Sequence, residues 1–577
     1  MLYLLYIRFG GICIKKIVLT TLNSKYIHSS LSPWCLFAGL KQHSRVPFDC
    51  EVIEGTVNED ISLFAQKIID KKPNIIGFSV YIWNKIQTYS LIEIIKNELK
   101  TVTIVAGGPE VAYNPREVLA ENESIDYILS GEGEYPFAML TDGLAAGEDI
   151  SSIYGLSFRK NGKIISNEPY ISNEDPPSPY SEEYLANLNG RIAYLETSRG
   201  CPFSCAFCLS GRCGGVRFFD IEKSKENMLL LANSGAKTIK LVDRTFNADR
   251  KRAKELFDFV ISEYGKRIPL GVCFHFEIAG DLLDDETLSL LSKAPRGSIQ
   301  LEIGIQSFNS QTLRSINRKT ESCKLKENIK SLLKYKNIHI HIDLIAGLPY
   351  EDLNSFENSF NEAYFLSADM LQLGFLKLLH GASMRENKSK FPCEFLNVPP
   401  YEVISTPWLS AADLQELHFV EIALDKLYNS SKFNTTLDYL ISGTLYSPYK
   451  LFNAFGKHIV AKAKEHCSLD ELKNILYDFL LNDKKADMAV LRDKMIRDRL
   501  KNSSTGVIPE RIRVKDEKLL KIKKYLQADP ALASKRAVKR SIAILYTENS
   551  AVFADYCEDE KENGKYKIHE ISLDMIK

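Results

Sequence analysis

Short apolar runs alternate with amphipathic stretches along the first part of the chain. Strand-like runs lie at residues 16–22, 52–54, 75–81, 102–106 and 127–129, and helical patterns lie near residues 62–71, 88–100, 115–122 and 136–146. Alternation of strand and helix is typical of a doubly wound parallel sheet. We therefore predict an α/β domain over residues 15–150, whose ligands bind at the carboxyl ends of the strands.

A second series of strand and helix patterns occupies residues 191–380. Several of its strands alternate polar with apolar residues, as where Glu277, Glu302 and His341 are each flanked by apolar neighbours. Period two places each polar set on one face of its strand. Six β/α units of this kind resemble the partial (β/α)6 barrel of a known enzyme family, so we expect a barrel with a polar lumen. The alternative is an antiparallel sheet with one solvent-exposed face. The helices between the strands make this alternative less favoured, because sequential β/α units favour parallel sheets.

The remaining segments have simpler patterns. Residues 1–14 are apolar but too short to span a bilayer, and we interpret them as an N-terminal extension. Residues 151–190 contain an Asn161-Gly162 hairpin turn and a group of prolines, so they are predicted to form a linker. Residues 381–577 are predicted to be mainly helical, with helix starts at Ser410 and Ser468.

Composition excludes some functions for the chain as a whole. The 577 residues contain 74 Lys and Arg and 74 Asp and Glu, so no overall basic footprint for nucleic acid exists, although a local patch is compatible with this balance. Twelve cysteines without a paired framework favour a reducing cytoplasm over secretion. No run reaches the length of a membrane span.

Candidate chemistry concentrates in one loop directly after the first barrel strand. It runs from Arg199 to Cys208 and spaces Cys201, Cys205 and Cys208 as C-x3-C-x2-C. Three thiolates can each hold one iron of a 4Fe–4S cluster, which leaves one iron open to a small molecule. A zinc site or three buried thiols are the alternatives, but zinc prefers four ligands and no second cysteine pair stands out.

This cysteine loop resembles the motif of the radical S-adenosylmethionine (SAM) superfamily. The resemblance implies that the open iron binds SAM and that the reduced cluster cleaves it to a 5′-deoxyadenosyl radical. The run from Glu302 to Phe308 and the following Arg318 are similar to the SAM-holding stretch of the coproporphyrinogen dehydrogenase branch. By this resemblance the SAM-binding residues are Phe207, Asp243, Glu277, Glu302, Gln306, Arg318 and Gly347.

The loops at the carboxyl ends of the first domain's strands carry Ser79-Val-Tyr81, Gly107-Gly108 and Gly131-Glu132. Together these loops resemble the cobalamin-binding domain, a Rossmann-like fold. Lys25 stands where some members carry the histidine that binds cobalt, and His28 comes three residues later, so the axial ligand of cobalt stays open. The resemblance implies a cobalamin site at Ser24, Tyr26, His28, Ser79, Tyr81, Gly107, Gly108, Gly131 and Glu132.

These resemblances lead to the hypothesis of a cobalamin-dependent radical SAM enzyme. The expected reaction is methyl transfer to an unactivated carbon of a small molecule, with flavodoxin or ferredoxin as electron donor. Two alternatives are a cyclisation, rearrangement or oxidation that uses both cofactors, and a non-catalytic sensor of cobalamin or redox state. The tail resembles an uncharacterised domain found in such proteins, and we hypothesise that it closes the barrel or selects substrate.

Overall fold

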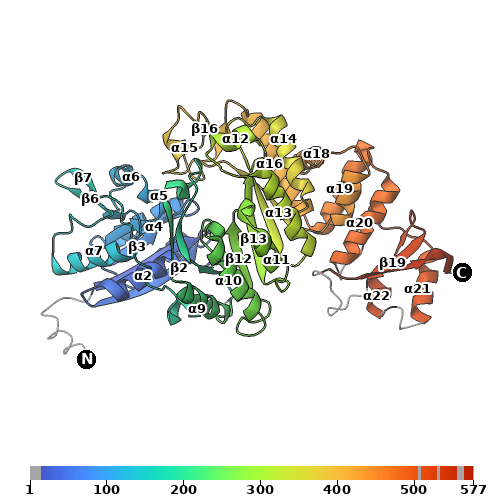
Figure 1. Cartoon of the computed structure of the whole chain (residues 1–577). Coiled ribbons are helices and arrows are strands. Elements are labelled where there is room, and N and C mark those ends of the chain that lie inside the picture. Colours follow the sequence, from blue (N-terminus) through green and yellow to red (C-terminus); the bar gives the residue numbers. More distant parts are fainter. Residues whose placement is uncertain are drawn as a thin grey trace.

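The computed structural model describes residues 15–575, apart from residues 189, 213, 504–507, 529–532, 534 and 555–564. The extension predicted at residues 1–14 lies outside the described residues. Three parts follow one another in a row, namely an N-terminal sheet, a central barrel and the tail (Figure 1). Within the described residues, no helix is long and apolar enough to cross a membrane.

The N-terminal part is a seven-stranded sheet in the order β2-β1-β3-β4-β5-β6-β7, and its first five strands are parallel. This confirms the predicted doubly wound fold. Those strands are β1 (Lys15–Asn23), β2 (Phe48–Thr56), β3 (Ile75–Ser79), β4 (Thr103–Gly107) and β5 (Tyr127–Leu129). The predicted helices are α3 (Ile61–Ile69), α4 (Lys85–Glu98), α6 (Pro115–Glu121) and α7 (Glu134–Ala146).

Two features of this part differ from the sequence pattern. Helix α2 (Ser32–His43) was not predicted, because most of its residues are buried and no side chain caps its start. The helix shows no clear polar stripe, and the available start signal in the sequence was Pro33 in its first turn. The hairpin of β6 (Leu156–Lys160) and β7 (Lys163–Ser166) pairs antiparallel with β5, so it extends this sheet instead of forming a separate linker.

The central part is a six-stranded sheet whose neighbouring strands are all parallel, which confirms the partial barrel and excludes the antiparallel alternative. Buried residues such as Ile299, Leu301 and Ile303 face the surrounding helices. The strands are β8 (Ala193–Leu195), β11 (Thr238–Leu241), β12 (Cys273–Ile278), β13 (Ile299–Gln306), β14 (His339–Ala346) and β15 (Met370–Phe375). The helices include α9 (Ile221–Ala232), α10 (Arg250–Glu263), α11 (Asp285–Leu291), α13 (Ser322–Tyr335) and α14 (Leu353–Phe365).

Each open edge of this barrel is covered by a different domain. At the β8 edge, the amide of Ile192 donates a 2.7 Å hydrogen bond to the carbonyl of Ile27, in the loop after β1. At the β15 edge, the side chain of Asn429 accepts from the amide of Leu371 at 3.0 Å and donates to its carbonyl at 2.9 Å. Both contacts satisfy backbone groups that an edge strand would otherwise leave unpaired.

The tail is mainly helical, as predicted, and ends in a three-stranded antiparallel sheet. Ser410 and Asp413 form a complete capping box at the start of α16 (Ala411–Leu424). Helix α16 packs on β15 and α18 packs on α14, whereas the later elements extend away from the barrel (Figure 1). The elements of the tail after α16 are α17 (Asn434–Ser442), α18 (Pro448–Ala461), α19 (Leu469–Asp483), α20 (Met488–Asn502), α21 (Lys518–Ala528), α22 (Lys535–Arg540), β18 (Ala543–Leu545), β19 (Ser550–Ala554) and β20 (Ile568–Ser572).

Candidate functional site

The cysteine loop is closed at its base by a short antiparallel hairpin. Strand β9 (Ser198–Cys201) pairs with β10 (Gly215–Phe218), and Cys201 lies opposite Gly215. Gly200 has φ of +104°, and a Cβ on it would lie 2.1 Å from the carbonyl oxygen of Gly215. A glycine is therefore required next to the first cysteine, because only glycine combines this backbone conformation with so close an approach.

Asp243 holds the start of the same hairpin. Its carboxylate accepts hydrogen bonds from the Thr197 amide at 2.8 Å, the Thr197 hydroxyl at 2.7 Å and the Ser198 hydroxyl at 2.5 Å. Burial raises the pKa of Asp243, although these three hydrogen bonds act to lower it. The expected role was a contact with the amino group of SAM. In this structure the carboxylate, only 1% exposed, positions the strand that leads into the cysteines, and its contact with SAM stays a prediction.

The thiols of the loop lie beside polar side chains of the barrel. The Arg318 guanidinium donates a 2.6 Å hydrogen bond to the carbonyl of Gly304 and approaches Cys205 Sγ at 3.9 Å. The Thr245 hydroxyl lies 3.4 Å from Cys201 Sγ. Burial raises the pKa of the Cys205 thiol, against the charge of Arg318. A cation beside the thiols favours their ionised form, which is the form that binds metal.

The spacing of the three sulfurs fits a cluster better than a single ion. Sulfurs held 2.3 Å from a tetrahedral zinc lie about 3.8 Å apart. Among the described residues, the ligand atoms found within 4.8 Å of one another are those of Glu302, His341 and Asp343, not those of the cysteines. The wider spread of the thiols agrees with a group that presents several irons.

Two predicted SAM-binding residues keep buried polar atoms without a partner. Within the described part of the chain, Gln306 Oε1 and Arg318 Nε have no hydrogen-bond partner. Gln306 has φ of +70° and follows an irregularity in the register between β13 and β14. An unsatisfied buried polar group is costly, so both atoms fit a site that a polar ligand completes. Phe207 packs against the core beside this site.

Gly347 lies at the end of β14, where the resemblance places the backbone that reads adenine. Its φ is +90°, and a Cβ on it would lie 2.5 Å from Val403 Cγ1. Val403 begins β17 (Val403–Ser405), at the start of the tail. The tail therefore packs directly on this part of the barrel mouth.

The polar faces of the strands meet inside the barrel, as predicted. Lys240 on β11 lies 3.3 Å from Glu277 and 3.1 Å from Glu302. Burial opposes ionisation of Glu302, but the hydrogen bond from His275 and the charge of Lys240 outweigh it and lower the pKa of Glu302 to about 2. Burial raises the pKa of Glu277, although the positive charge of Lys240 acts to lower it.

Two histidines complete this lumen cluster, which we define as Lys240, His275, Glu277, Glu302, His341 and Asp343. His275 Nε2 lies 2.9 Å from Glu302, and His341 Nε2 lies 3.0 Å from Asp343. Burial lowers the pKa of His341, but the hydrogen bond with Asp343 outweighs it, so the net shift is upward. We assign this cluster to ion pairing and not to a metal, because the amine of Lys240 already lies against Glu302.

The carboxyl end of the N-terminal sheet is organised by Asn84. Its amide donates to the Thr21 hydroxyl and to the carbonyls of Leu22 and Ser79, and its oxygen accepts from the Tyr81 amide. The Tyr81 hydroxyl donates to Ser32, and its ring stacks on Trp83 with centroids 4.5 Å apart. Trp83 is 45% exposed, so a stacked aromatic surface lies open at this end of the sheet.

The glycines of this end allow close backbone approaches. Gly108 has φ of +98°, and a Cβ on it would lie 2.6 Å from the Val80 carbonyl. Gly131 has φ of +90°, and a Cβ there would lie 2.2 Å from the Tyr170 carbonyl. At Gly107 a Cβ would meet only the Leu129 carbonyl, at an ordinary 3.6 Å. The first two glycines thus shape the loops themselves, while Gly107 leaves the backbone uncovered by a side chain.

The loop after β1 reaches the barrel. His28 Nδ1 lies 2.8 Å from the Tyr194 hydroxyl on β8, and burial lowers the pKa of His28. Tyr26 is 71% exposed and faces Arg191, whose guanidinium lies 5.7 Å from its ring centre. Ser24 is half-buried. This loop therefore offers an exposed ring and a histidine that is already bonded through one nitrogen.

A buried ion network joins the N-terminal sheet to the cysteine loop. Arg199, two residues before Cys201, pairs with Glu132 at 2.6 Å, Glu134 at 2.5 Å and Glu196 at 2.9 Å. Arg217 on β10 also pairs with Glu132, at 2.8 Å. Both glutamates from the first domain follow β5, so the carboxyl ends of the two parallel sheets face each other across these contacts.

Sequence reasoning did not single out three residues that organise this region. Asn84 lies in a loop that the sequence singles out for other residues, and Arg199 stands directly before the cysteines. Lys240 is a charged residue in the middle of an apolar strand, which was the available signal for a lumen position. Their roles depend on partners distant in the sequence.

Comparison with known proteins divides the chain in the same way. Residues 17–141 match the model of the B12 binding domain, residues 195–363 that of the radical SAM superfamily, and residues 389–561 that of a protein of unknown function, DUF4080. These matches confirm the predicted combination of domains, and with it the 4Fe–4S cluster, SAM and cobalamin.

Several known proteins are similar to this chain. An uncharacterized methyltransferase of Pyrococcus horikoshii is 28% identical over 60% of this chain and 76% of its own length. The cobalamin-dependent radical SAM methyltransferase TokK of Streptomyces tokunonensis is 25% identical over 50% of this chain, which spans 44% of its length. The structure of the cobalamin-dependent radical enzyme OxsB has a TM-score of 0.59 at 15% identity and covers 85% of this chain and 84% of its own, so it shows the shared fold.

Proposed function

This chain is a radical SAM enzyme with a B12-binding domain and a DUF4080 domain, and on this premise we propose that it transfers a methyl group from SAM to an unactivated carbon of a small molecule. When bound, the cluster and cobalamin supply the radical chemistry and the methyl carrier. The single observation that carries the proposal is the facing of the two carboxyl ends through Arg199, Glu132 and Glu134. It puts the B12-binding loops beside the cysteine loop.

Residues of the barrel would bind and orient SAM. Cys201, Cys205 and Cys208 would hold the cluster, and Arg318 would face the carboxylate of SAM with its planar guanidinium. The partnerless Oε1 of Gln306 would accept a hydrogen bond from the same ligand. Glu277 and Glu302 would attract the positively charged groups of SAM. Both carboxylates are half-buried in the lumen.

The substrate would enter between the two domains. The stacked Tyr81 and Trp83 offer a flat surface on one side, and the lumen cluster offers charged groups on the other. The protein's contribution would be to hold the reacting carbon in place and to exclude water, since proximity alone supplies a large part of the rate. The relatives named as methyltransferases support methyl transfer, and relatives named as anaerobic magnesium-protoporphyrin IX monomethyl ester cyclases keep cyclisation as the second candidate.

The proposal is tested with SAM that carries a deuterated methyl group. The reconstituted chain is incubated without oxygen with a metabolite extract, a reductant and cobalamin, and products are analysed by mass spectrometry. We expect a product whose mass rises by three units when deuterated SAM replaces ordinary SAM, and whose formation stops without cobalamin. Formation of 5′-deoxyadenosine with an extract-derived product that carries no label would contradict methyl transfer.

A further inference from the structure

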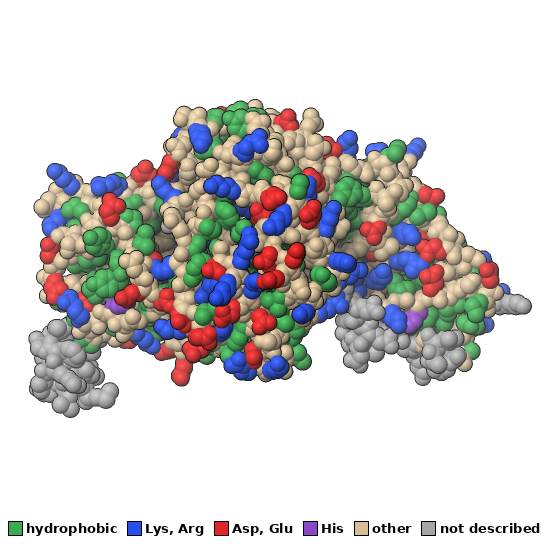
Figure 2. Space-filling view, in the orientation of Figure 1, with side chains coloured by type: hydrophobic (Ala, Val, Ile, Leu, Met, Phe, Trp, Pro, Cys, Tyr) green, Lys and Arg blue, Asp and Glu red, His purple; other side chains and the backbone are tan. Residues whose placement is uncertain are grey.

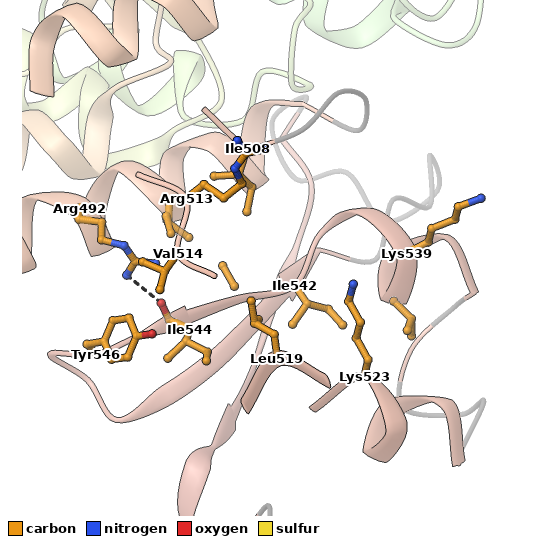
Figure 3. A pocket seen from close by; sticks show the side chains of 13 residues that line it. Arg492, Ile508, Arg513, Val514, Leu519, Lys523, Lys539, Ile542, Ile544 and Tyr546 are labelled. Atoms are coloured by element: carbon orange, nitrogen blue, oxygen red, sulfur yellow. Dashed lines mark hydrogen bonds between the residues drawn. The ribbon is translucent and has the colours of Figure 1, made fainter. Parts of the chain in front are cut away.

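A cavity of about 440 Å³ lies in the tail, away from the barrel. It is enclosed by α20, the segment before α21, α21, α22 and β18 (Figure 3). Its volume falls within the range of sites that hold small molecules. The side chains that line it are Arg492, Ile496, Ile508, Arg513, Val514, Leu519, Lys523, Val538, Lys539, Ile542, Ala543, Ile544 and Tyr546.

The inner lining of this tail cavity is aliphatic. Ile496, Val538, Ala543 and Ile544 are almost fully buried around it. Leu519 on α21 is half-buried and faces the same space. An aliphatic wall of this kind favours an apolar group of a ligand, because burial removes its surface from water.

Three cations line the cavity without an acidic partner among the described residues; Lys523 is half-buried, and Arg513 and Lys539 are exposed. Figure 3 shows Lys523 rising from α21 beside Ile542, while Lys539 extends toward the outside. Arg492 differs, because its guanidinium is already bonded to Asp493 and to the carbonyls of Ile512 and Ile544. Like charges that gather around one cavity without acids make it a site for an anion.

The surrounding segment is strongly basic. Residues 484–540 contain eighteen Lys and Arg but only seven Asp and Glu, in a chain whose net charge is zero. Lys and Arg side chains also gather where the barrel meets the tail (Figure 2). The positive potential of this segment would attract an anion over a distance of about 8 Å at physiological salt.

We propose that the tail cavity binds an anionic amphiphile, a molecule with an apolar body and a phosphate or carboxylate head. The apolar body lies against Ile496, Leu519 and Val538, and the head faces the half-buried Lys523. Single-stranded nucleic acid fits less well, because its bases need aromatic stacking surfaces and Tyr546 is the one aromatic side chain that lines the cavity.

The test uses octyl phosphate, titrated into the full-length reconstituted protein in a calorimeter. We expect saturable binding at one site per chain. Inorganic phosphate and uncharged octyl glucoside, which each carry half of the chemistry, should bind at least about tenfold more weakly, a difference of about 1.4 kcal/mol. No saturable binding of octyl phosphate, or equal binding of inorganic phosphate, would overturn the proposal.

Neighbouring residues on α21 provide matched controls. Lys523→Glu should weaken binding at least about tenfold, whereas Lys524→Glu, which changes the charge equally outside the cavity lining, should change it less than about twofold. Leu519→Gln and the exposed Leu520→Gln form a second pair with the same expected contrast. Equal losses within each pair would show general electrostatics or a folding defect and would contradict the site.

Two further probes identify the source of the head group. Vesicles of phosphatidylglycerol that bind the wild type but not Lys523→Glu would mean that the amphiphile is a membrane lipid. Binding of octyl phosphate without binding of vesicles would mean a soluble ligand. An oligoribonucleotide that binds tightly while octyl phosphate does not bind would overturn the proposal in favour of a nucleic-acid surface.

Discussion

The barrel lumen and the tail cavity each contain a half-buried lysine. The lysine of the lumen is paired with carboxylates, and that of the tail cavity is not. In the lumen Lys240 lies against two carboxylates, and His341 lies 3.0 Å from Asp343. In the tail cavity Lys523 and Arg513 have no described acidic partner. The lumen is therefore organised by internal ion pairs before any ligand arrives, whereas the half-buried Lys523 of the tail cavity is paired with no acid of the described residues.

This difference indicates what substitutions should do in each place. A residue in a satisfied network leaves a buried partner behind when it is removed, which costs several kcal/mol. Removal of an unpaired cation leaves nothing behind and relieves repulsion. The following experiments use this contrast, beginning with the largest expected effect.

The largest effect is expected from Cys205→Ala, which removes one of the three thiols. Formation of 5′-deoxyadenosine should fall by at least about a thousandfold, because the cluster loses a ligand. Iron content should fall in parallel, while octyl phosphate binding stays unchanged because the tail cavity is separate. Cys323→Ala, at an exposed cysteine, is the control and should keep the iron content and the formation of 5′-deoxyadenosine of the wild type. Full iron content in Cys205→Ala would contradict the assignment.

Arg199→Ala tests whether the ion pairs between the two domains stabilise the fold, as the ion pairs of the lumen are expected to do. It leaves Glu134 and Glu196 buried without their cation, and chemical denaturation should show a loss of about 3–5 kcal/mol. Arg267→Ala, which breaks an exposed and solvent-screened pair with Glu263, should change the free energy of unfolding far less. Similar losses in both variants would mean that the interface network does not stabilise the fold.

Glu302→Gln tests the lumen through its pH dependence. The pKa of Glu302 is lowered to about 2 in the folded chain, so its ionised form stabilises the fold above the unfolded pKa near 4.5. That stability, about 3 kcal/mol, is lost as pH falls from about 5 to about 2. The variant should therefore be less stable than wild type at pH 7 and equal to it near pH 2. A stability difference that does not change with pH would exclude this account.

The smallest effect, and one of opposite sign, is expected from Lys523→Gln. Relief of repulsion should raise the free energy of unfolding by about 0.5 kcal/mol or less at low salt. The gain should disappear at high salt, where screening acts over a few ångströms. Lys240→Gln is the counterpart in the lumen and should destabilise the chain. A loss of stability in Lys523→Gln at low salt would mean that Lys523 has a partner after all.

Much of the fold follows from local patterns. Period-two alternation in β12, β13 and β14 placed Glu277, Glu302 and His341 in the lumen, because a parallel barrel leaves no other place for a polar face. The cysteine spacing led to the cluster. Helix α2 was missed, since a helix that is buried nearly all round has no polar stripe to reveal it.

The remaining features depend on partners far apart in the sequence. Arg199 and Glu132 are separated by 67 residues, and no local pattern predicts their contact. Asp243 was expected to face SAM, but its hydrogen bonds to Thr197 and Ser198 became visible only with the fold. The basic segment around Lys523 was hidden by the neutral total, because acidic residues elsewhere balance it.

The most direct test of the central claim is the metal content and SAM cleavage of one preparation. The full-length chain is rebuilt without oxygen with iron, sulfide and cobalamin, and is then reduced in the presence of SAM. We predict about four irons per chain, bound cobalamin and formation of 5′-deoxyadenosine. A preparation that holds zinc in place of iron, or that holds no iron and leaves SAM intact, would contradict the account.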